Sequence, residues 1–236
     1  MNKITLALLL FMATLANAQQ VYMGGGKSST KFEYKNSQGI SLDNLQAASR
    51  SFMTAGYRNQ LLTKNLHLNL GANYASYGAI GSDATLGNYM AWDVNYAGLD
   101  VGLDYHLFHI QSASIYVKTG MSAGLFIQGT QTLNNRVIDL KNNEDFGSML
   151  SMQVGAGFSH PISEHLSFYT QYLYGKSANM SKGDAELKIE SSNVSFGLLV
   201  HLSKKKTSHR KRKKNISREL EKLNETVRND GSNLIF

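Results

Sequence analysis

Histidine is the residue type in this chain best suited to acid–base or metal chemistry. The chain has seven histidines and no cysteine, so a metal site would depend on imidazole and carboxylate ligands. Six histidines lie at or beside the ends of stretches in which apolar and polar residues alternate: His67, His106, His109, His160, His165 and His201. They come from several stretches without paired spacing, and the carboxylate nearest to them on a short connection is Glu164. We therefore interpret them as side chains at a membrane interface and assign no metal site.

Charged residues on the small-and-polar face of these stretches form a second candidate site. They are Arg58, Asp93, Asp100, Asp104 and Lys118. If this face points into a narrow interior, an unpaired charge there is costly, so opposite charges should pair. A turn centred on residue 111 places Asp104 directly opposite Lys118, and His106 opposite Tyr116. We therefore predict a lumen charge network that includes an Asp104–Lys118 pair.

The segment Met23-Gly24-Gly25-Gly26-Lys27-Ser28 ends like a phosphate-binding loop. That motif needs a glycine five residues before Gly26, where it forms the turn that aims backbone amides at phosphate. Position 21 is Val21, so the match fails. Glycines that ease strand curvature or close approach explain the segment better. We assign no catalytic residue and no cofactor.

The elements that must position the charged residues follow from period-two alternation with turn residues between the runs. In the clearest run, Val194, Phe196 and Leu198 share one face, and Ser195 and Gly197 share the other. The pattern predicts eight strands, near residues 20–34, 51–61, 66–78, 89–107, 114–130, 150–158, 166–174 and 194–202. Within 89–107 the apolar phase slips at Ala97-Gly98, which predicts a β-bulge there.

The connections between these strands alternate in length. Three are short, at residues 62–65, 108–113 and 160–165. The others are longer and polar, at residues 36–49, 79–87, 132–146 and 178–187. Short turns at one end and long loops at the other are typical of outer-membrane barrels, with both termini in the periplasm. The mean hydropathy of −0.27 excludes a bundle of transmembrane helices.

The two faces of the strands differ in composition. One face is rich in Gly, Ser, Asn and Gln, and the other is aliphatic with aromatic residues near the strand ends. Small residues inside and apolar residues outside suit a narrow barrel in lipid. Alternation alone does not say which face is outside, so a soluble, lipocalin-like barrel with an apolar ligand remains the alternative.

Residues 19–202 resemble the small eight-stranded outer-membrane barrels, the class of the outer-membrane protein A barrel domain and of protein X. The layout Ser51-Phe52, Gly56-Tyr57-Arg58 and Gly71-Ala72-Asn73-Tyr74 is similar to the barrel-domain proteins of Bacteroidota. The final strand, 195–202, resembles the signal that the barrel-assembly machinery recognises. In that family the signal usually ends the chain, whereas here 34 residues follow, 203–236. The resemblance implies an all-β, antiparallel, up-and-down transmembrane barrel.

The ends of the chain differ from the barrel. Residues 1–18 have the basic start, apolar core and Ala16-Asn17-Ala18 site of a cleaved signal peptide. Residues 203–236 contain eleven Lys or Arg and four Asp or Glu, whereas 19–202 contain twelve and thirteen. The basic run of this tail consists of Lys204, Lys205, Lys206, Arg210, Lys211, Arg212, Lys213 and Lys214. Ile216, Leu220, Leu223 and Val227 follow at helical spacing. Because the excess charge lies outside the folded domain, we expect no nucleic-acid partner.

These features predict a non-enzymatic outer-membrane barrel with a structural or interaction role. Its expected partners are outer-membrane lipid, the barrel-assembly machinery, and a periplasmic protein or the cell wall, bound through the basic tail. A small pore or an accessory subunit of an export complex is the alternative. Some eight-stranded outer-membrane barrels are lipid A acyltransferases or deacylases. Resemblance to them implies that such an enzyme would have a His and a Ser near the outer leaflet, where its substrate lies. The histidines here lie at the opposite end, so a lipid-modifying enzyme is disfavoured.

The cleavage site yields a first prediction. We expect the mature protein to begin at Gln19 and to migrate on gels as heat-modifiable β-structure from the outer-membrane fraction. Intact-mass analysis of protein purified from membranes checks this. A mass that retains residues 1–18, or recovery in the soluble fraction without detergent, contradicts it.

Overall fold

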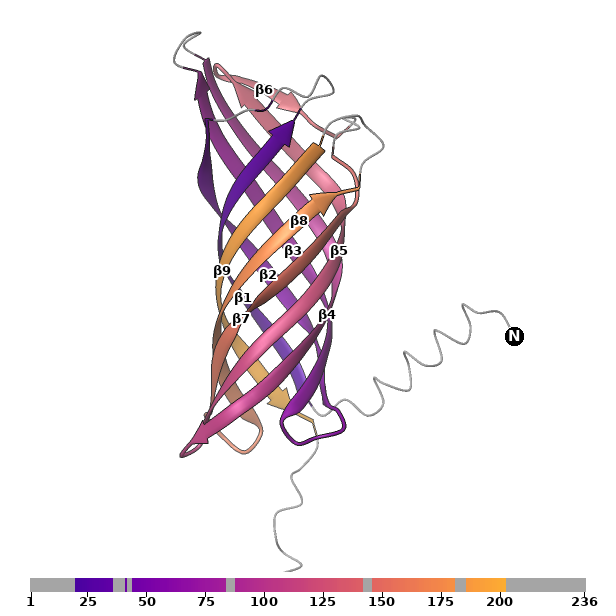
Figure 1. Cartoon of the computed structure of the whole chain (residues 1–236), viewed down its shortest axis with the longest axis vertical. Helices are drawn as coiled ribbons and strands as arrows, with labels where there is room; N and C mark the ends of the chain where they lie inside the picture. Colours follow the sequence, from indigo (N-terminus) through magenta and orange to yellow (C-terminus); the bar gives the residue numbers. More distant parts are fainter. Residues whose placement is uncertain are drawn as a thin grey trace, which may run out of the picture. The chain divides into compact units, whose positions relative to one another are not determined.

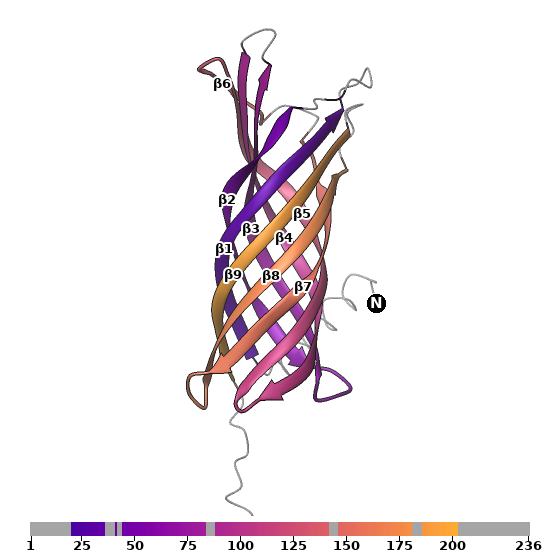
Figure 2. The ribbon, with the colours of Figure 1, turned by 60° about the vertical axis from the view of Figure 1, so that its left-hand side comes forward.

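The computed structural model describes residues 20–35, 41, 44–83, 88–141, 146–180 and 186–202. The strands are β1 Gln20–Lys35, β2 Leu45–Gln60, β3 Leu66–Asp83, β4 Asn88–Ile110, β5 Ala113–Leu133, β6 Arg136–Asp139, β7 Met149–Pro161, β8 Leu166–Asn179 and β9 Glu186–His201. Each long strand pairs antiparallel with its neighbours in the chain, and β1 also pairs with β9 (Figures 1 and 2). The eight long strands therefore close into a barrel, as the alternation predicts. The short strand β6 adds only to β5.

The connections of the barrel lie at the predicted two ends, but the predicted long connection at residues 79–87 is wrong: β3 continues to Asp83 and β4 begins at Asn88, so only four residues separate them. Gln20 at the start of β1 pairs with His201 at the end of β9, so both strands reach the end that carries the short turns. We call this the short-turn end, and the opposite end the long-loop end. The β4–β5 turn is tighter than predicted, because β4 continues to Ile110 and only Gln111 and Ser112 separate the strands. Gln111 adopts a positive φ of 56°, as such a turn requires.

Strand β4 passes through two environments without changing its side-chain alternation. Trp92, Val94 and Tyr96 are buried inside the barrel, and the inward series continues through Gly102 and Asp104. The outward series is polar near the long-loop end and becomes apolar toward the short-turn end, where Leu99, Val101, Leu103 and Tyr105 are exposed. The apolar face thus changes from inside to outside along one strand.

The predicted bulge at Ala97-Gly98 is therefore wrong. Both residues keep their cross-strand partners, and the phase slip in the sequence marks the change of environment instead. One register shift between β4 and β5 does lie next to the predicted position, between Asn95 and Tyr96, but its extra residue is Ile127 of β5. The other lies between His106 and Phe108 and leaves Leu107 of β4 without a partner.

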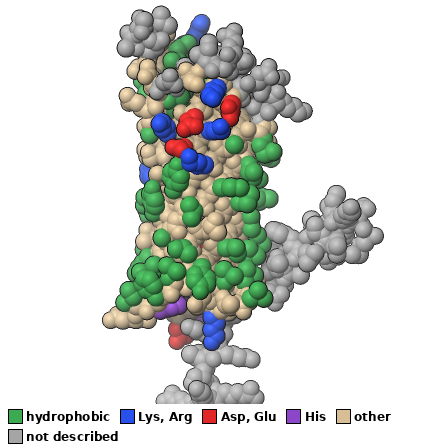
Figure 3. Space-filling model, viewed as in Figure 1, with side chains coloured by type: hydrophobic (Ala, Val, Ile, Leu, Met, Phe, Trp, Pro, Cys, Tyr) green, Lys and Arg blue, Asp and Glu red, His purple; other side chains and the backbone are tan. Residues whose placement is uncertain are grey.

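The barrel consequently has two sections. Around the section nearer the short-turn end, the outer surface is an apolar band, and most of the charged residues on this side of the barrel lie beyond it toward the long-loop end (Figure 3). The section at the long-loop end has a hydrophobic core inside it, in which Tyr96 contacts Tyr77 at 5.8 Å and Phe126 at 5.6 Å between ring centroids. Phe146, from the connection between β6 and β7, packs on Phe126. This core closes the barrel from the long-loop end.

Tyrosines on the inner wall of the apolar-band section pack against glycines. The ring of Tyr22 occupies the space that a side chain at Gly56 or Gly71 would need, and Tyr116 does the same at Gly157. Close approach of a ring to the backbone explains these glycines, because a Cβ atom would collide with it. The lumen is also narrow enough for side chains from opposite walls to meet, as expected for eight strands, since Lys118 of β5 lies over the ring of Tyr22 of β1 at 5.8 Å.

Candidate functional site

The structure brings four of the five predicted lumen charges inside the barrel. Arg58 of β2 and Asp104 of β4 are each only 3% exposed, and Asp100 and Lys118 also point inward. The prediction that Asp93 faces the lumen is wrong: it lies on the outer surface, paired with Arg50 at 2.9 Å. The error follows from the assumed bulge. Without a slip at Ala97-Gly98, Asp93 falls on the outward series.

Asp104 is the centre of the lumen network. Its two carboxylate oxygens lie 3.0 Å from Arg58 Nε and 3.6 Å from Lys118 Nζ. Asp104 and Lys118 are direct cross-strand partners, as are His106 and Tyr116. The guanidinium of Arg58 also lies over the ring of Tyr116 at 5.7 Å. Two cations thus share one buried carboxylate.

Toward the short-turn end, the network continues through histidines and a glutamine. Arg58 donates to Gln20 Oε1 at 3.2 Å and to His106 Nε2 at 2.6 Å. Gln20 Nε2 in turn lies 3.1 Å from His201 Nδ1. The prediction of interfacial side chains is therefore wrong for His106, which is buried in the lumen. The sequence held a signal for this, because His106 has the same parity on β4 as Asp104.

Each of these two histidines contacts a serine. His106 Nδ1 contacts Ser114 Oγ, and His201 Nε2 lies 3.0 Å from Ser167 Oγ. Since Arg58 can only donate, His106 Nε2 accepts, so the ring proton is on Nδ1 and is donated to Ser114. The amide of Gln20 likewise donates to His201, which then donates to Ser167. Neither imidazole is oriented to remove a proton from its serine, as a nucleophile would require.

Asp100 occupies a second level of the lumen. It accepts hydrogen bonds from Asn73 and, at 3.3 Å, from Thr54. A cavity of about 90 Å³ lies at this level, lined mainly by hydroxyl, amide and tyrosine side chains. The hydrophobic core is beyond it on one side and the Arg58–Asp104 pair on the other. The lumen is therefore blocked on both sides of this cavity, and the charged residues that line it compensate each other's charges.

Within the part of the chain that the structure describes, no group of three His, Asp or Glu residues is arranged to hold a metal ion. The same residues form no helix that is long and apolar enough to cross a membrane.

Comparison with known proteins identifies the architecture. The model of the outer membrane protein beta-barrel domain matches residues 4–201. The chain belongs to this family. Lipid therefore surrounds the apolar band in the outer membrane, and the charge network lies in the lumen. Barrels of this class have short turns in the periplasm and longer loops outside, so the short-turn end faces the periplasm and the long-loop end the exterior.

Solved structures share the architecture at low sequence identity. Neisserial surface protein A is 13% identical with a TM-score of 0.45, covering 77% of this chain and 97% of its own. Pseudomonas aeruginosa OprG is 14% identical with a TM-score of 0.44, covering 78% and 97%. The Escherichia coli outer membrane protease OmpT is 7% identical with a TM-score of 0.47, covering 78% and 96%. No curated protein matches the chain.

The burial of Asp104 yields a second prediction. Replacing Asp104 with Ala leaves Arg58 and Lys118 without their carboxylate, so we expect the barrel to lose about 3–5 kcal/mol of unfolding free energy. Urea unfolding in lipid vesicles, followed by heat-modifiable gel migration, measures this loss.

Asp93→Ala is the matched control, because it removes the same carboxylate from an ion pair on the outer surface. The side chain of Asp93 is 44% exposed, and such pairs contribute at most about 1 kcal/mol. Equal losses in the two variants would show that the lumen pair is not specially important.

Proposed function

We propose that this outer-membrane barrel is a non-enzymatic structural or interaction protein. It presents its outer section to the exterior and docks its basic tail on an anionic partner in the periplasm. The observation that carries the proposal is a lumen blocked at two levels: the Arg58–Asp104 pair lies at one and the core around Tyr96 at the other, with a cavity of about 90 Å³ between them. What the protein offers to partners is then its outer surface, its loops and its tail.

The geometry of the serine–histidine pairs supports the non-enzymatic part of this proposal. Ser114 and Ser167 are buried inside the periplasmic end of the barrel, away from lipid and from the outer leaflet. Their histidines are held as hydrogen-bond donors by Arg58 and Gln20. A lipid-modifying enzyme needs an activated group that its substrate can reach, and neither serine meets this need.

The proposal for the tail rests on its charge. Residues 203–236 lie outside the described residues, and their proposed role comes from the sequence. Eight of the eleven residues from Lys204 to Lys214 are Lys or Arg, and this run begins three residues after the last residue of β9, His201. A basic run of this density is attracted to an anionic surface by about 1 kcal/mol per residue. The partner is an acidic periplasmic protein or an acidic cell-wall polymer.

A third prediction separates this function from a pore. Because the Arg58–Asp104 pair and the core around Tyr96 block the lumen on either side of its cavity, we expect pure protein in planar bilayers to give no steady conductance. The positive control for a widened lumen is a variant in which both Tyr96 and Tyr116 are replaced by Ala. Stable, large single-channel steps from the unmodified protein would support the pore alternative instead.

A fourth prediction concerns the tail. Deleting residues 203–236 should leave barrel assembly intact and abolish co-sedimentation with isolated cell-wall or periplasmic extract, and high salt should act like the deletion. Deleting only 215–236 is the matched control, because it keeps the basic run and should preserve the association.

Two results would contradict the docking role of the tail. If the truncated barrel fails to insert, the tail belongs to the assembly signal. If association survives both the full deletion and high salt, contacts on the barrel are responsible for it.

A further inference from the structure

Arg58 crosses the lumen at its periplasmic level. From β2 its guanidinium reaches Gln20 of β1, Asp104 of β4 and the ring face of Tyr116 of β5. The tyrosine rings of the same section lie against glycines of the wall instead. The guanidinium of Arg58 therefore separates the cavity of about 90 Å³ from the periplasmic end of the barrel.

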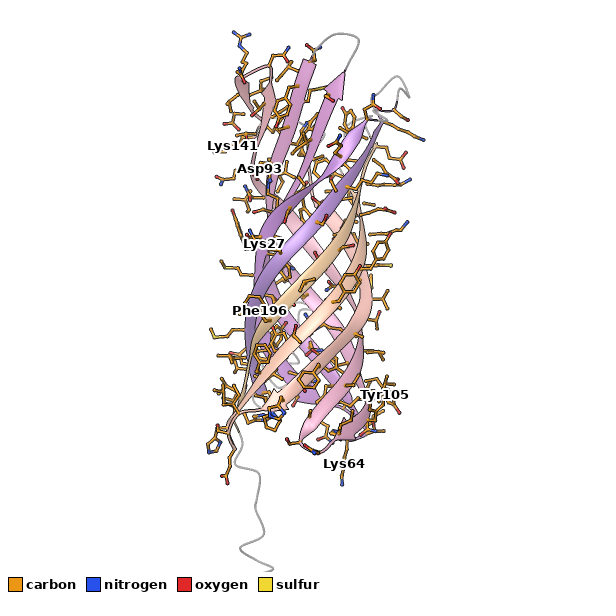
Figure 4. The ribbon with its side chains drawn as sticks, turned by 90° about the vertical axis from the view of Figure 1, so that its left-hand side faces the viewer. Lys27, Lys64, Asp93, Tyr105, Lys141 and Phe196 are labelled. Carbon is orange, nitrogen blue, oxygen red and sulfur yellow. The ribbon has the colours of Figure 1, made fainter. Side chains whose placement is uncertain are left out.

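His106 contacts this guanidinium from the periplasmic side. Its Nε2 lies 2.6 Å from Arg58 Nη2, and its Nδ1 contacts Ser114. Its backbone N–H donates to the carbonyl of Asn65, in the short turn before β3, at 2.8 Å. Figure 4 shows Tyr105, the neighbour of His106 in β4, close to the short-turn end that also carries Lys64. His106 is thus buried at the periplasmic rim of the lumen.

The contact between His106 and Arg58 requires a neutral imidazole. A guanidinium has only donors, so Nε2 must accept with its lone pair. A proton on Nε2 would set one N–H group against another and place two positive charges side by side. The position of Arg58 across the lumen therefore depends on the protonation state of His106.

The surroundings of His106 do not favour a further positive charge. The titratable groups near it come from several strands: Arg58, His67, Asp104, His109, Tyr116 and His201. Asp104 is the acid of this group, and Arg58 and Lys118 already share its carboxylate. Asp100 is four residues farther along β4, about 13 Å at the usual rise of a strand. A proton on His106 would therefore add to an excess of positive charge.

We propose that His106 and Arg58 form a pH switch that opens the lumen cavity to the periplasm. At neutral pH, His106 holds Arg58 across the lumen. In acid, protonated His106 repels Arg58 and replaces it as the donor to Asp104, two residues away on the same face of β4. Arg58 then turns toward the periplasm. Because the open arrangement binds a proton that the closed one excludes, acid favours opening.

The switch leaves the barrel closed toward the exterior. The core around Tyr96 contains no charged group, so acid does not act on it directly. Opening thus gives a chamber that faces the periplasm rather than a channel. The interaction role proposed above does not depend on this switch.

An introduced cysteine can report access to the cavity, because the chain contains none. Ser28 lines the cavity, is 2% exposed, and its hydroxyl has no hydrogen-bond partner among the described residues, so Ser28→Cys preserves the packing. The full mature chain in detergent is treated with methyl methanethiosulfonate at about pH 7.5 and about pH 5, on either side of the usual pKa of histidine. Intact-mass analysis gives the rate of labelling.

The matched comparison is the same cysteine combined with His106→Gln. A glutamine can accept from Arg58 and donate to Ser114 without titrating. Because a thiol reacts as its thiolate, its reactivity falls in acid, and comparison of the two proteins at one pH removes this effect.

We expect equal labelling rates at neutral pH and faster labelling with His106 in acid. The difference at pH 5 should reach up to about 30-fold, because a histidine in water with a pKa near 6.5 is then protonated about 30 to 1. His165→Gln, in the exposed turn between β7 and β8, is a further control and should leave the acid rate unchanged. Ser122→Cys, also on the cavity wall, replaces Ser28→Cys if the latter does not give heat-modifiable protein.

Four results would overturn the switch. The first is an equal rate at pH 5 with and without His106→Gln. The second is loss of the acid effect in His67→Gln while His106 is present, which would move the proton to β3. The third is steady conductance at pH 5, which would show that acid also opens the core. The fourth is loss of heat-modifiable migration at pH 5, which would show that acid unfolds the barrel.

Discussion

The closure of eight strands into one ladder is the constraint on which the rest of this structure depends. It gives each long strand two neighbours for its backbone hydrogen bonds, as lipid demands of a spanning segment. It also fixes a lumen so narrow that side chains from opposite walls touch. Polar side chains in that lumen have no bulk water to contact, so each needs a partner on another strand. The position of Asp104 between Arg58 and Lys118 meets this need, because without its carboxylate both cations would be uncompensated charges in the lumen.

The second constraint is that the barrel is longer than its apolar band. Where the outer wall faces lipid, apolar residues point outward and the lumen is polar. Beyond the band the outer wall faces water, and the inward residues Trp92, Val94 and Tyr96 form a core like that of a soluble barrel. One continuous strand therefore obeys two opposite patterns. The hydrophobic core at the exterior end closes the lumen that the charge network closes at the periplasmic end.

The sequence predicted what depends on alternation within a single environment. The eight strands, the three short turns and the register of Asp104 with Lys118 follow from the two-residue period and one turn position. Asp93 was placed on the wrong face because an inversion of environment and a bulge produce the same slip in the apolar phase. The real irregularities, at Leu107 and Ile127, lie where both faces carry apolar residues, so no phase change reveals them.

Other features of the site were beyond sequence reasoning for a different reason. That His106 and His201 are fixed as donors depends on Arg58 and Gln20, which are distant in the chain and meet only through closure of the barrel. The contact of Lys118 with Asp104 and Tyr22 likewise depends on three strands, β1, β4 and β5, that meet only in the closed barrel.

Charged side chains on the inner and the outer wall of the barrel are compensated by partners of opposite charge. Among the four inward-facing charges, Arg58 and Lys118 balance Asp100 and Asp104, so the lumen contributes little field outside the barrel. On the outer wall, a glutamate lies directly across the strands from each of four lysines: Lys31, Lys35, Lys176 and Lys188. Lys27 lies across from Ser51 and Val194 instead. On both walls of the described barrel, charged side chains are thus compensated mainly by partners on neighbouring strands.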